Sequence, residues 1–326
     1  NLTLDYYWER RKDILIQRSS LPSMAGFDAS IYANMGEMDN KGVDANLEYQ
    51  TRIGNKVGLR LFGNLTYSKN KIVFRDEPAM QYAYQKSEGT RYGEFYGYIA
   101  EGYFQSEEEI KKSPRQMREL APGDIKYKDL NDDGVIDAND QCYLGKSWFP
   151  SWSYGMGFNI NYHNFDLALF FQGVSDVSIM ANGGSIDTGN GDWGASGVGI
   201  VPFTGMGLNP SNVITKALDR WTADNPRADA WYPRMTANAT TNDNNYVNST
   251  HWLKDGSYLR LKQASLGYTL ENKKLMDKGI EYLYFYLSGQ NLLTFSKFKL
   301  WDPELGSNGA KYPLSRMVTL GMRVSF

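Results

Sequence analysis

Residues 318–326, Val-Thr-Leu-Gly-Met-Arg-Val-Ser-Phe, alternate between apolar side chains and polar or small ones. Successive side chains of a β-strand point to opposite faces, so this period of two predicts a strand with one apolar face. Residues 43–50 and 154–162 repeat the pattern. Segments of the same character lie at 1–16, 57–70, 164–174, 257–270 and 280–293. The sequence therefore predicts an all-β fold of about eight strands, each long enough to cross a bilayer at a tilt.

The connections between these segments differ sharply in length. Residues 54–56, 163–164 and 271–279 make short turns, whereas residues 17–41, 71–152, 175–256 and 294–314 make long loops. If the last strand ends on the periplasmic side, every short turn falls on that side and every long loop on the outside. This asymmetry is typical of outer-membrane barrels. This arrangement requires that the strand-like stretch 94–104 belong to the 71–152 loop and not cross the membrane.

The long loops have some content of their own. Residues 106–120 predict a short helix interrupted at Pro114, and residues 210–221 predict another. The Gly-rich stretch 183–207 and the Asn/Thr-rich stretch 236–250 predict irregular loops.

Composition excludes several classes of protein. The 326 residues carry 35 Lys and Arg against 37 Asp and Glu, a net charge of −2, which argues against a nucleic-acid binder. A single cysteine, Cys142, rules out an intrachain disulfide, and two histidines argue against a multi-histidine metal site. No run of 18 apolar residues is present to form a transmembrane helix. Neither a G-x-S-x-G elbow nor a phosphate loop occurs, so we expect no enzyme.

One motif predicts a calcium loop. Residues 129–140 place oxygen donors at positions 1, 3, 5, 7, 9 and 12 of the calcium-loop template, with Gly134 at position 6 for the sharp turn. The predicted ligands are Asp129, Asn131, Asp133, the carbonyl of Val135, Asp137 and Asp140. Asp140 is shorter than the usual Glu. The alternative is an acidic turn that holds no ion.

Tryptophans mark candidate contacts with substrate or a partner. Trp148 and Trp152 flank Phe149 and Pro150 just before a predicted strand, and Trp193 lies in the 175–256 loop. They could form a stacking platform for a sugar or a partner protein. The alternative for the first two is an aromatic girdle at the membrane interface. Trp221, Trp231 and Trp252 lie in or beside the same loop as Trp193. These four could anchor a ligand or hold the large loop together.

Several stretches resemble one family in order and spacing. They are Lys12–Leu15, Asn34–Val43, Gly93–Tyr98, Pro122–Tyr127, Tyr258–Lys262 with Leu266–Tyr268, Ser288–Thr294, and the terminal strand ending in Phe326. Through them the chain resembles the C-terminal part of SusC/RagA-type TonB-dependent outer-membrane transporters.

The resemblance implies a barrel of about 22 strands in the outer membrane of a Gram-negative bacterium. It also implies an N-terminal plug, coupling to TonB, and a SusD-like surface lipoprotein as a lid. Neither the plug nor the TonB-contacting segment lies in residues 1–326, which we interpret as a fragment with roughly fourteen strands missing. The expected activity is active import of a large nutrient, an oligosaccharide or glycan, with peptide import by the same architecture as an alternative.

Two further alternatives come from other classes. The chain could be a passive small barrel or an adhesin, complete at eight strands. It could also be a soluble calcium-dependent carbohydrate-binding protein. Large apolar strand faces such as Leu283, Phe285 and Leu287 argue against the soluble alternative, because they would form exposed apolar patches in water.

Overall fold

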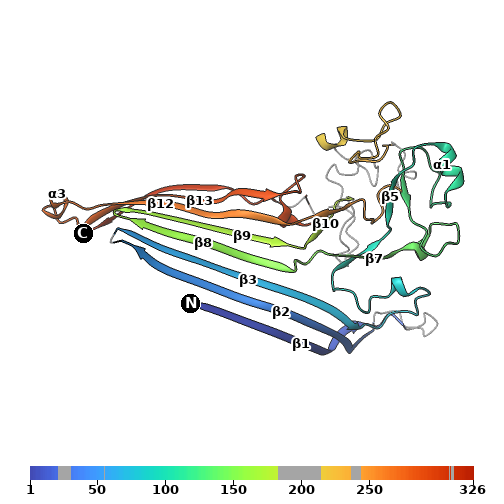
Figure 1. Cartoon of the computed structure of the whole chain (residues 1–326), viewed down its shortest axis with the longest axis horizontal. Helices are drawn as coiled ribbons and strands as arrows, with labels where there is room; N and C mark the ends of the chain where they lie inside the picture. The colour runs from blue at the N-terminus through green and yellow to red at the C-terminus, as the bar shows by residue number, and fades with distance from the viewer. Residues whose placement is uncertain (21–30, 55, 183–213, 236–243, 308, 310–311) are drawn as a thin grey trace.

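The computed structural model describes residues 1–20, 31–54, 56–182, 214–235, 244–307, 309 and 312–326. Eight strands form one antiparallel sheet in the order β1-β2-β3-β8-β9-β12-β13-β14 (Figure 1). Their bounds are β1 Leu2–Gln17, β2 Tyr32–Ile53, β3 Val57–Phe74, β8 Trp152–Tyr162, β9 Phe165–Ser175, β12 Tyr258–Leu270, β13 Tyr282–Ser296 and β14 Met317–Ser325. Each strand thus pairs with its neighbours along the chain in the large sheet. The predicted fold class and the eight strands are confirmed.

The two ends of the sheet differ. The short turns after β2, β8 and β12 lie at one end, together with the C-terminus, and the long connections lie at the other (Figure 1). We call these the turn end and the loop end. The connection after β12 is not plain loop, because it contains the helical turn α3, Lys273–Met276.

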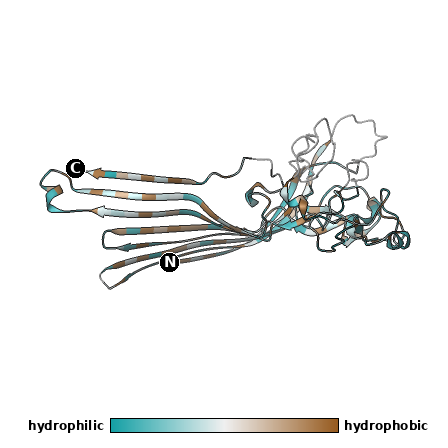
Figure 2. Ribbon diagram, turned by 90° about the horizontal axis from the view of Figure 1, so that it is seen from above, coloured by the Kyte–Doolittle hydropathy of each residue, from teal (hydrophilic) through white to brown (hydrophobic). Residues whose placement is uncertain are grey.

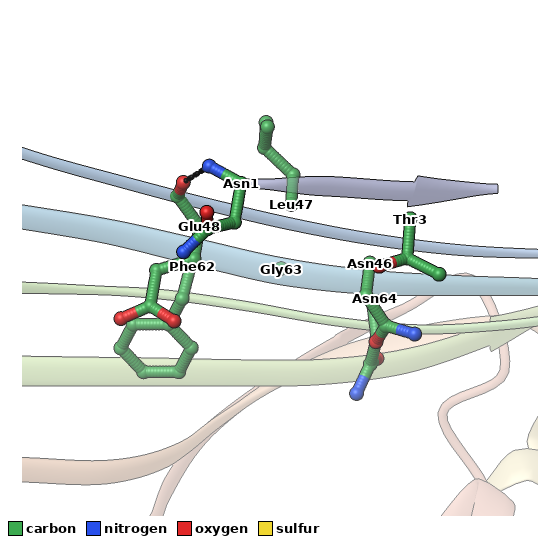
Figure 3. A pocket seen from close by; sticks show the side chains of 8 residues that line it. All are labelled: Asn1, Thr3, Asn46, Leu47, Glu48, Phe62, Gly63 and Asn64. Carbon is green, nitrogen blue, oxygen red and sulfur yellow. Dashed lines mark hydrogen bonds between the residues drawn. The ribbon is translucent and has the colours of Figure 1, made fainter.

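The strand register separates an apolar face from a polar face. Leu47 lies opposite Leu2 on β1, and Leu266 lies between Leu167 and Leu287. Hydrophobic and hydrophilic residues alternate along the strands in Figure 2. In Figure 3 the side chain of Leu47 points to one side of the sheet, and those of Glu48 and Phe62 point to the other. Many large apolar side chains on the first face are exposed, including Leu4, Leu47 and Leu320.

A bulge in β12 changes the face on which the first residues of this strand lie. In β12, Leu261 pairs with Phe171 but Gln263 pairs with Phe170, so Lys262 is an extra residue. The sequence pattern alone puts Arg260 on the face of Leu266. The bulge reverses the alternation, because one inserted residue moves all preceding side chains to the opposite face. Arg260 consequently lies on the polar face, opposite Gln172.

Some predicted boundaries are wrong. Residues 32–41, predicted as loop, extend β2, where Gln17 pairs with Tyr32 across the first connection. These residues show no clean alternation, yet the backbone of β1 satisfies their hydrogen bonds. The helix predicted over 106–120 is limited to α1, Glu107–Lys112, because Pro114 cannot continue it. Of the helix predicted over 210–221, the described part contains a 3-10 helix at Thr215–Leu218.

Small sheets build the loop end. The stretch 94–104 stays outside the large sheet, as predicted. It forms β4, Glu94–Gly97, which pairs with β7, Cys142–Ser147, and β5, Ala100–Tyr103, which pairs with β6, Ile125–Tyr127. A third pair joins β10, Ser178–Met180, to β11, Leu253–Asp255. None of the described helices is long and apolar enough to cross a membrane.

Candidate functional site

The polar face carries aromatic rings that lie on glycines of the neighbouring strand. Phe62 is paired with Gly157, and a Cβ atom on Gly157 would lie 2.5 Å from Phe62 Cζ. Tyr286 covers Gly321 in the same way. The rings of Phe62 and Phe170 are parallel within 10°, with centroids 6.0 Å apart. The glycines therefore allow the aromatic rings to pack directly against the backbone of the sheet on this face.

Amide and hydroxyl groups surround these rings. Asn46, Asn64, Thr3 and Glu48 line a hollow beside Phe62 at the edge of the sheet (Figure 3). Farther along the same face, the hydroxyl of Tyr284 donates to Asp166 Oδ2 at 3.0 Å. Charged groups also lie here, since Arg60 sits over the Phe62 ring, 5.0 Å from its centroid, and pairs with Glu48. Rings among such hydrogen-bonding groups suit both sugars and peptides, because each combines apolar faces with many donors and acceptors.

The two longest loops fold together into one packed body, which we call the loop cluster. Its buried residues come from both loops and are Tyr98, Tyr103, Ile125, Tyr127, Ile136, Met180, Ala217, Trp221, Ala230, Tyr232 and Trp252. Trp221 is 6% exposed and Trp252 is fully buried. Both therefore hold the large loop together, which was one of the two interpretations of these tryptophans.

A buried polar network crosses between the loops at Asp124. Its carboxylate lies against Arg234, with Nε 2.6 Å from Oδ1 and Nη2 donating to Oδ2 at 2.9 Å. Asn245 Nδ2 donates to the same carboxylate at 2.8 Å. Buried charges need such partners, because an unpaired carboxylate in an apolar interior is costly. Sequence reasoning missed this network, since more than 100 residues separate its members and no motif links them.

His251 and Lys254 lie in the same loop cluster, where the His251 ring contacts Trp252. His251 Nε2 is 3.1 Å from the Trp231 carbonyl oxygen, and Lys254 Nζ donates to the His251 carbonyl at 2.6 Å. Burial lowers the pKa of His251 to about 4, and the positive charge of Lys254 adds to the effect. Burial also lowers the pKa of Lys254 to about 8. His251 is therefore neutral at pH 7 and serves as a packing and hydrogen-bonding group.

A second buried ion pair attaches the last long loop to the polar face. Arg260, 1% exposed, places Nη2 2.6 Å from Asp302 Oδ1 and Nη1 3.6 Å from Glu304 Oε2. The Tyr258 hydroxyl donates to Glu304 at 2.6 Å. Phe298, in the same loop, packs against Ile179 of β10. The loop between β13 and β14 is thus fixed to the polar face and to the other loops.

The predicted calcium loop folds with the turn that its spacing requires. Gly134 adopts φ +81°, and the two oxygens of Asp129 accept the backbone N–H groups of Asp132 and Gly134 at 2.7 and 2.8 Å. Asn131 and Asp133 each accept a backbone N–H two residues onward.

The end of this loop is buried. Asp140 is fully buried and accepts the N–H groups of Leu130 and Asp137. Among the described residues, no group of three or more His, Cys, Asp and Glu is arranged to hold a metal ion. The four predicted aspartate ligands belong to these residue types, yet no three of them gather around one point. Calcium at residues 129–140 stays a prediction.

Two of the tryptophans predicted as contact residues lie in the described part of the chain, and their surroundings differ. Trp152 opens β8 on the apolar face and packs on Tyr67 at 4.5 Å between ring centroids. The ring of Trp148 contacts that of Phe149 at a tilt of 56°, with centroids 5.0 Å apart, and Trp148 is 40% exposed. Trp193 lies outside the described residues. The position of Trp152 fits a girdle better than a substrate platform, whereas Trp148 remains a candidate contact.

Comparison with known proteins agrees with this architecture. No protein-family model matches the chain. TonB-dependent receptor P3 of Formosa agariphila is 27% identical over 353 residues, which span 100% of this chain and 32% of the relative. TonB-dependent receptor SusC of Bacteroides thetaiotaomicron is 22% identical over 99% of this chain and 30% of its own length. The sheet and loops also superpose on the RagAB peptide importer in its closed-closed state, with a TM-score of 0.70 and 23% identity, covering 33% of that chain.

The chain is a homologue of the TonB-dependent receptors. It spans about a third of the length of the curated receptors that it matches. Its eight-stranded sheet corresponds to a portion of a TonB-dependent receptor barrel. The homologues are receptors and transporters, not enzymes, in agreement with the expectation from the sequence.

Proposed function

We propose that the chain is part of the barrel wall of an outer-membrane, TonB-dependent importer of SusC/RagA type. One observation carries the proposal: a single antiparallel sheet has an apolar face, a polar face, and all its long connections at one end. A sheet of this kind exposes too much apolar surface for water, and it suits a wall between lipid and a polar lumen. The homology to TonB-dependent receptors supports the same conclusion.

The proposal assigns an environment to each part. The apolar face contacts the bilayer and the polar face lines the lumen. The loop end, with loops 71–152 and 175–256, is extracellular, and the turn end is periplasmic. Nothing is bonded or cleaved during import. The remaining barrel strands, the plug, TonB and a SusD-like lipoprotein would be supplied by the rest of the receptor and its partners.

For the substrate we propose an oligosaccharide, with a peptide as the second candidate. The low aromatic rings at Phe62 and Phe170, set among asparagines, favour the first, because sugars stack on ring faces and bind amides. The fold likeness to the RagAB peptide importer motivates the second. Exposed Trp148 is a candidate contact for either.

Uptake by cells tests the proposal. A strain that lacks the intact gene should lose growth on one class of nutrient, and the gene should restore growth only when TonB is active. A panel of oligosaccharides and peptides as sole nutrient distinguishes the two substrate classes. Unchanged growth on the whole panel, or restored growth without TonB, would contradict active import.

A bound Ca²⁺ at residues 129–140 is a further part of the proposal. Asp129, Asn131, Asp133, the Val135 carbonyl, Asp137 and Asp140 would hold it, and its role would be structural. On an extracellular surface, even a site with a Kd of ~10⁻⁴–10⁻³ M is occupied to a useful degree.

A further inference from the structure

Basic side chains gather on the apolar face at the loop end of the first three strands. Tyr6 and Trp8 lie on this face of β1, and alternation places Arg10 next on the same face. Lys41 pairs with both Trp8 and Lys69, and Asp39 pairs with Lys71. We call this set the basic rim; it comprises Arg10, Lys41, Lys69 and Lys71.

The charges of the basic rim are not balanced within the described part of the chain. Arg10 takes both oxygens of Asp39, with Nε at 2.6 Å and Nη2 at 2.8 Å. Lys41 lies over the ring of Trp8, 5.6 Å from its centroid. No described carboxylate lies within ion-pair distance of Lys41, Lys69 or Lys71, and all three side chains are exposed.

One contact in the rim is unfavourable by itself. Lys41 and Lys69 are direct cross-strand partners on one face of the sheet. Like charges directly opposite each other destabilise an antiparallel pair, since their Cβ atoms lie only about 5 Å apart. An anion bridging the two ammonium groups would turn this repulsion into attraction.

The depth of the rim places it beside lipid headgroups. On β3 the apolar face runs from Val57 to Tyr67, ten residues later. At about 3.3 Å per residue and a tilt of about 40°, this stretch rises roughly 25 Å, the height of the apolar band of such barrels. Tyr6, Tyr67 and Trp152 lie in one row of the register and close the band with aromatic rings, and Trp8 lies in the next row with Lys41 and Lys69. Lys69 and Lys71 follow at once on the loop side.

We propose that the basic rim binds the phosphate groups of a phosphorylated glycolipid in the outer leaflet, with Lys41 and Lys69 bridged by one phosphate. The inference rests on the proposed outer-membrane location and orientation. It concerns the lipid-facing side, and so it is independent of what the lumen transports.

Lipid retention by the full-length receptor tests the rim. The receptor is reconstituted in phosphatidylcholine nanodiscs containing lipid A or dephosphorylated lipid A and is then extracted. Native mass spectrometry measures how much lipid stays bound to it. Wild type should retain phosphorylated lipid A. The variant K41Q/K69Q/K71Q should retain it roughly tenfold less or weaker still, because each lysine near a membrane surface adds to anion binding. The control K273Q/K274Q/K278Q changes three exposed lysines at the turn end and should behave as wild type.

Three results would overturn the proposal: equal retention by wild type and the rim variant, equal retention of dephosphorylated lipid A, or displacement by millimolar inorganic phosphate. The last would identify a free-phosphate site. The experiment measures bound lipid and not uptake. The lipid proposal would therefore stand even if TonB-dependent import failed its test, and a loss of lipid retention would not contradict import.

A single substitution gives a second readout with a change of sign. Lys69→Gln removes the repulsion with Lys41, so it should raise the unfolding temperature of the receptor in detergent without phosphorylated lipid. In lipid A nanodiscs it should lower that temperature, because the phosphate bridge is lost. A shift in the same direction in both media would contradict the bridge.

Discussion

His251 sits inside the loop cluster with a pKa lowered to about 4 by burial, against an ordinary value of about 6.5. Between these values the unfolded loop binds a proton that the folded loop excludes. The stability of the loop cluster is therefore complete above pH 6.5 and falls as the pH drops toward 4, by up to about 3 kcal/mol.

Denaturation of the loop cluster, followed by the fluorescence of Trp221 and Trp252, measures this effect. The variant His251→Gln keeps a polar side chain and cannot titrate. The difference in free energy of unfolding between wild type and this variant should therefore shrink as the pH falls from 7 to 4.5. A difference that is constant across this range would show that His251 is accessible to protons in the folded loop.

Arg260 provides the second test at the residue scale. Arg260→Met should leave Asp302 and Glu304 without their cation and weaken the docking of the β13–β14 loop by about 3–5 kcal/mol. Limited proteolysis within Lys297–Ser307 measures the release, with Arg316→Met as a control in an exposed position. Unchanged protection in Arg260→Met would mean that Phe298 packing alone holds the loop.

At the scale of single elements, glycines on the polar face set how closely rings approach the sheet. A Cβ on Gly157 would meet Phe62 Cζ at 2.5 Å and the Leu169 carbonyl at 2.7 Å, whereas a Cβ on Gly58 would have 3.7 Å to Asn161. Gly157→Ala should therefore destabilise the sheet by about 1–3 kcal/mol, and Gly58→Ala should be close to neutral. Equal shifts in the unfolding temperature of the receptor would mean that the Phe62 ring moves away freely.

The 129–140 loop is the second element to test. If it binds Ca²⁺, a chelator should lower the unfolding temperature of the loop cluster, and Asp133→Ala should abolish the response to added Ca²⁺. Asp133 is an exposed part of the loop, so its loss should disturb packing little. If the chelator lowers the unfolding temperature of Asp133→Ala as much as that of wild type, the ion is bound elsewhere. If the chelator changes neither temperature, the loop is a turn without an ion.

At the scale of the whole molecule, the separation of loop end and turn end predicts a topology. Leu218, 77% exposed in the loop cluster, should react with an impermeant thiol reagent in intact cells when it is replaced by cysteine. Met276, 55% exposed in α3, should react as cysteine after the outer membrane is permeabilised. Native Cys142 is buried and should contribute little. Labelling of both positions in intact cells would contradict the orientation.

Much of the sheet could be predicted, because the alternation of apolar and polar residues can be recognised from neighbouring residues alone. The alternation in 318–326 and 154–162 is local information, and it identified strands, faces and the long connections. It failed where a bulge intervened, at Lys262, and where β2 continued without alternation to Tyr32. In both places the backbone of a neighbouring strand decides the structure, and that neighbour is not visible in a local pattern.

The sequence by itself determined the all-β class, the eight strands, their apolar and polar faces and the division into short turns and long loops. The tertiary structure alone decided that loops 71–152 and 175–256 fold as one body, that Asp124 meets Arg234, and that Arg260 anchors the last loop. It also decided that Lys41 of β2 lies directly opposite Lys69 of the adjacent strand β3. The physical reason is range: strand character follows from adjacent residues, whereas burial and charge pairing depend on groups that only the folded chain brings together.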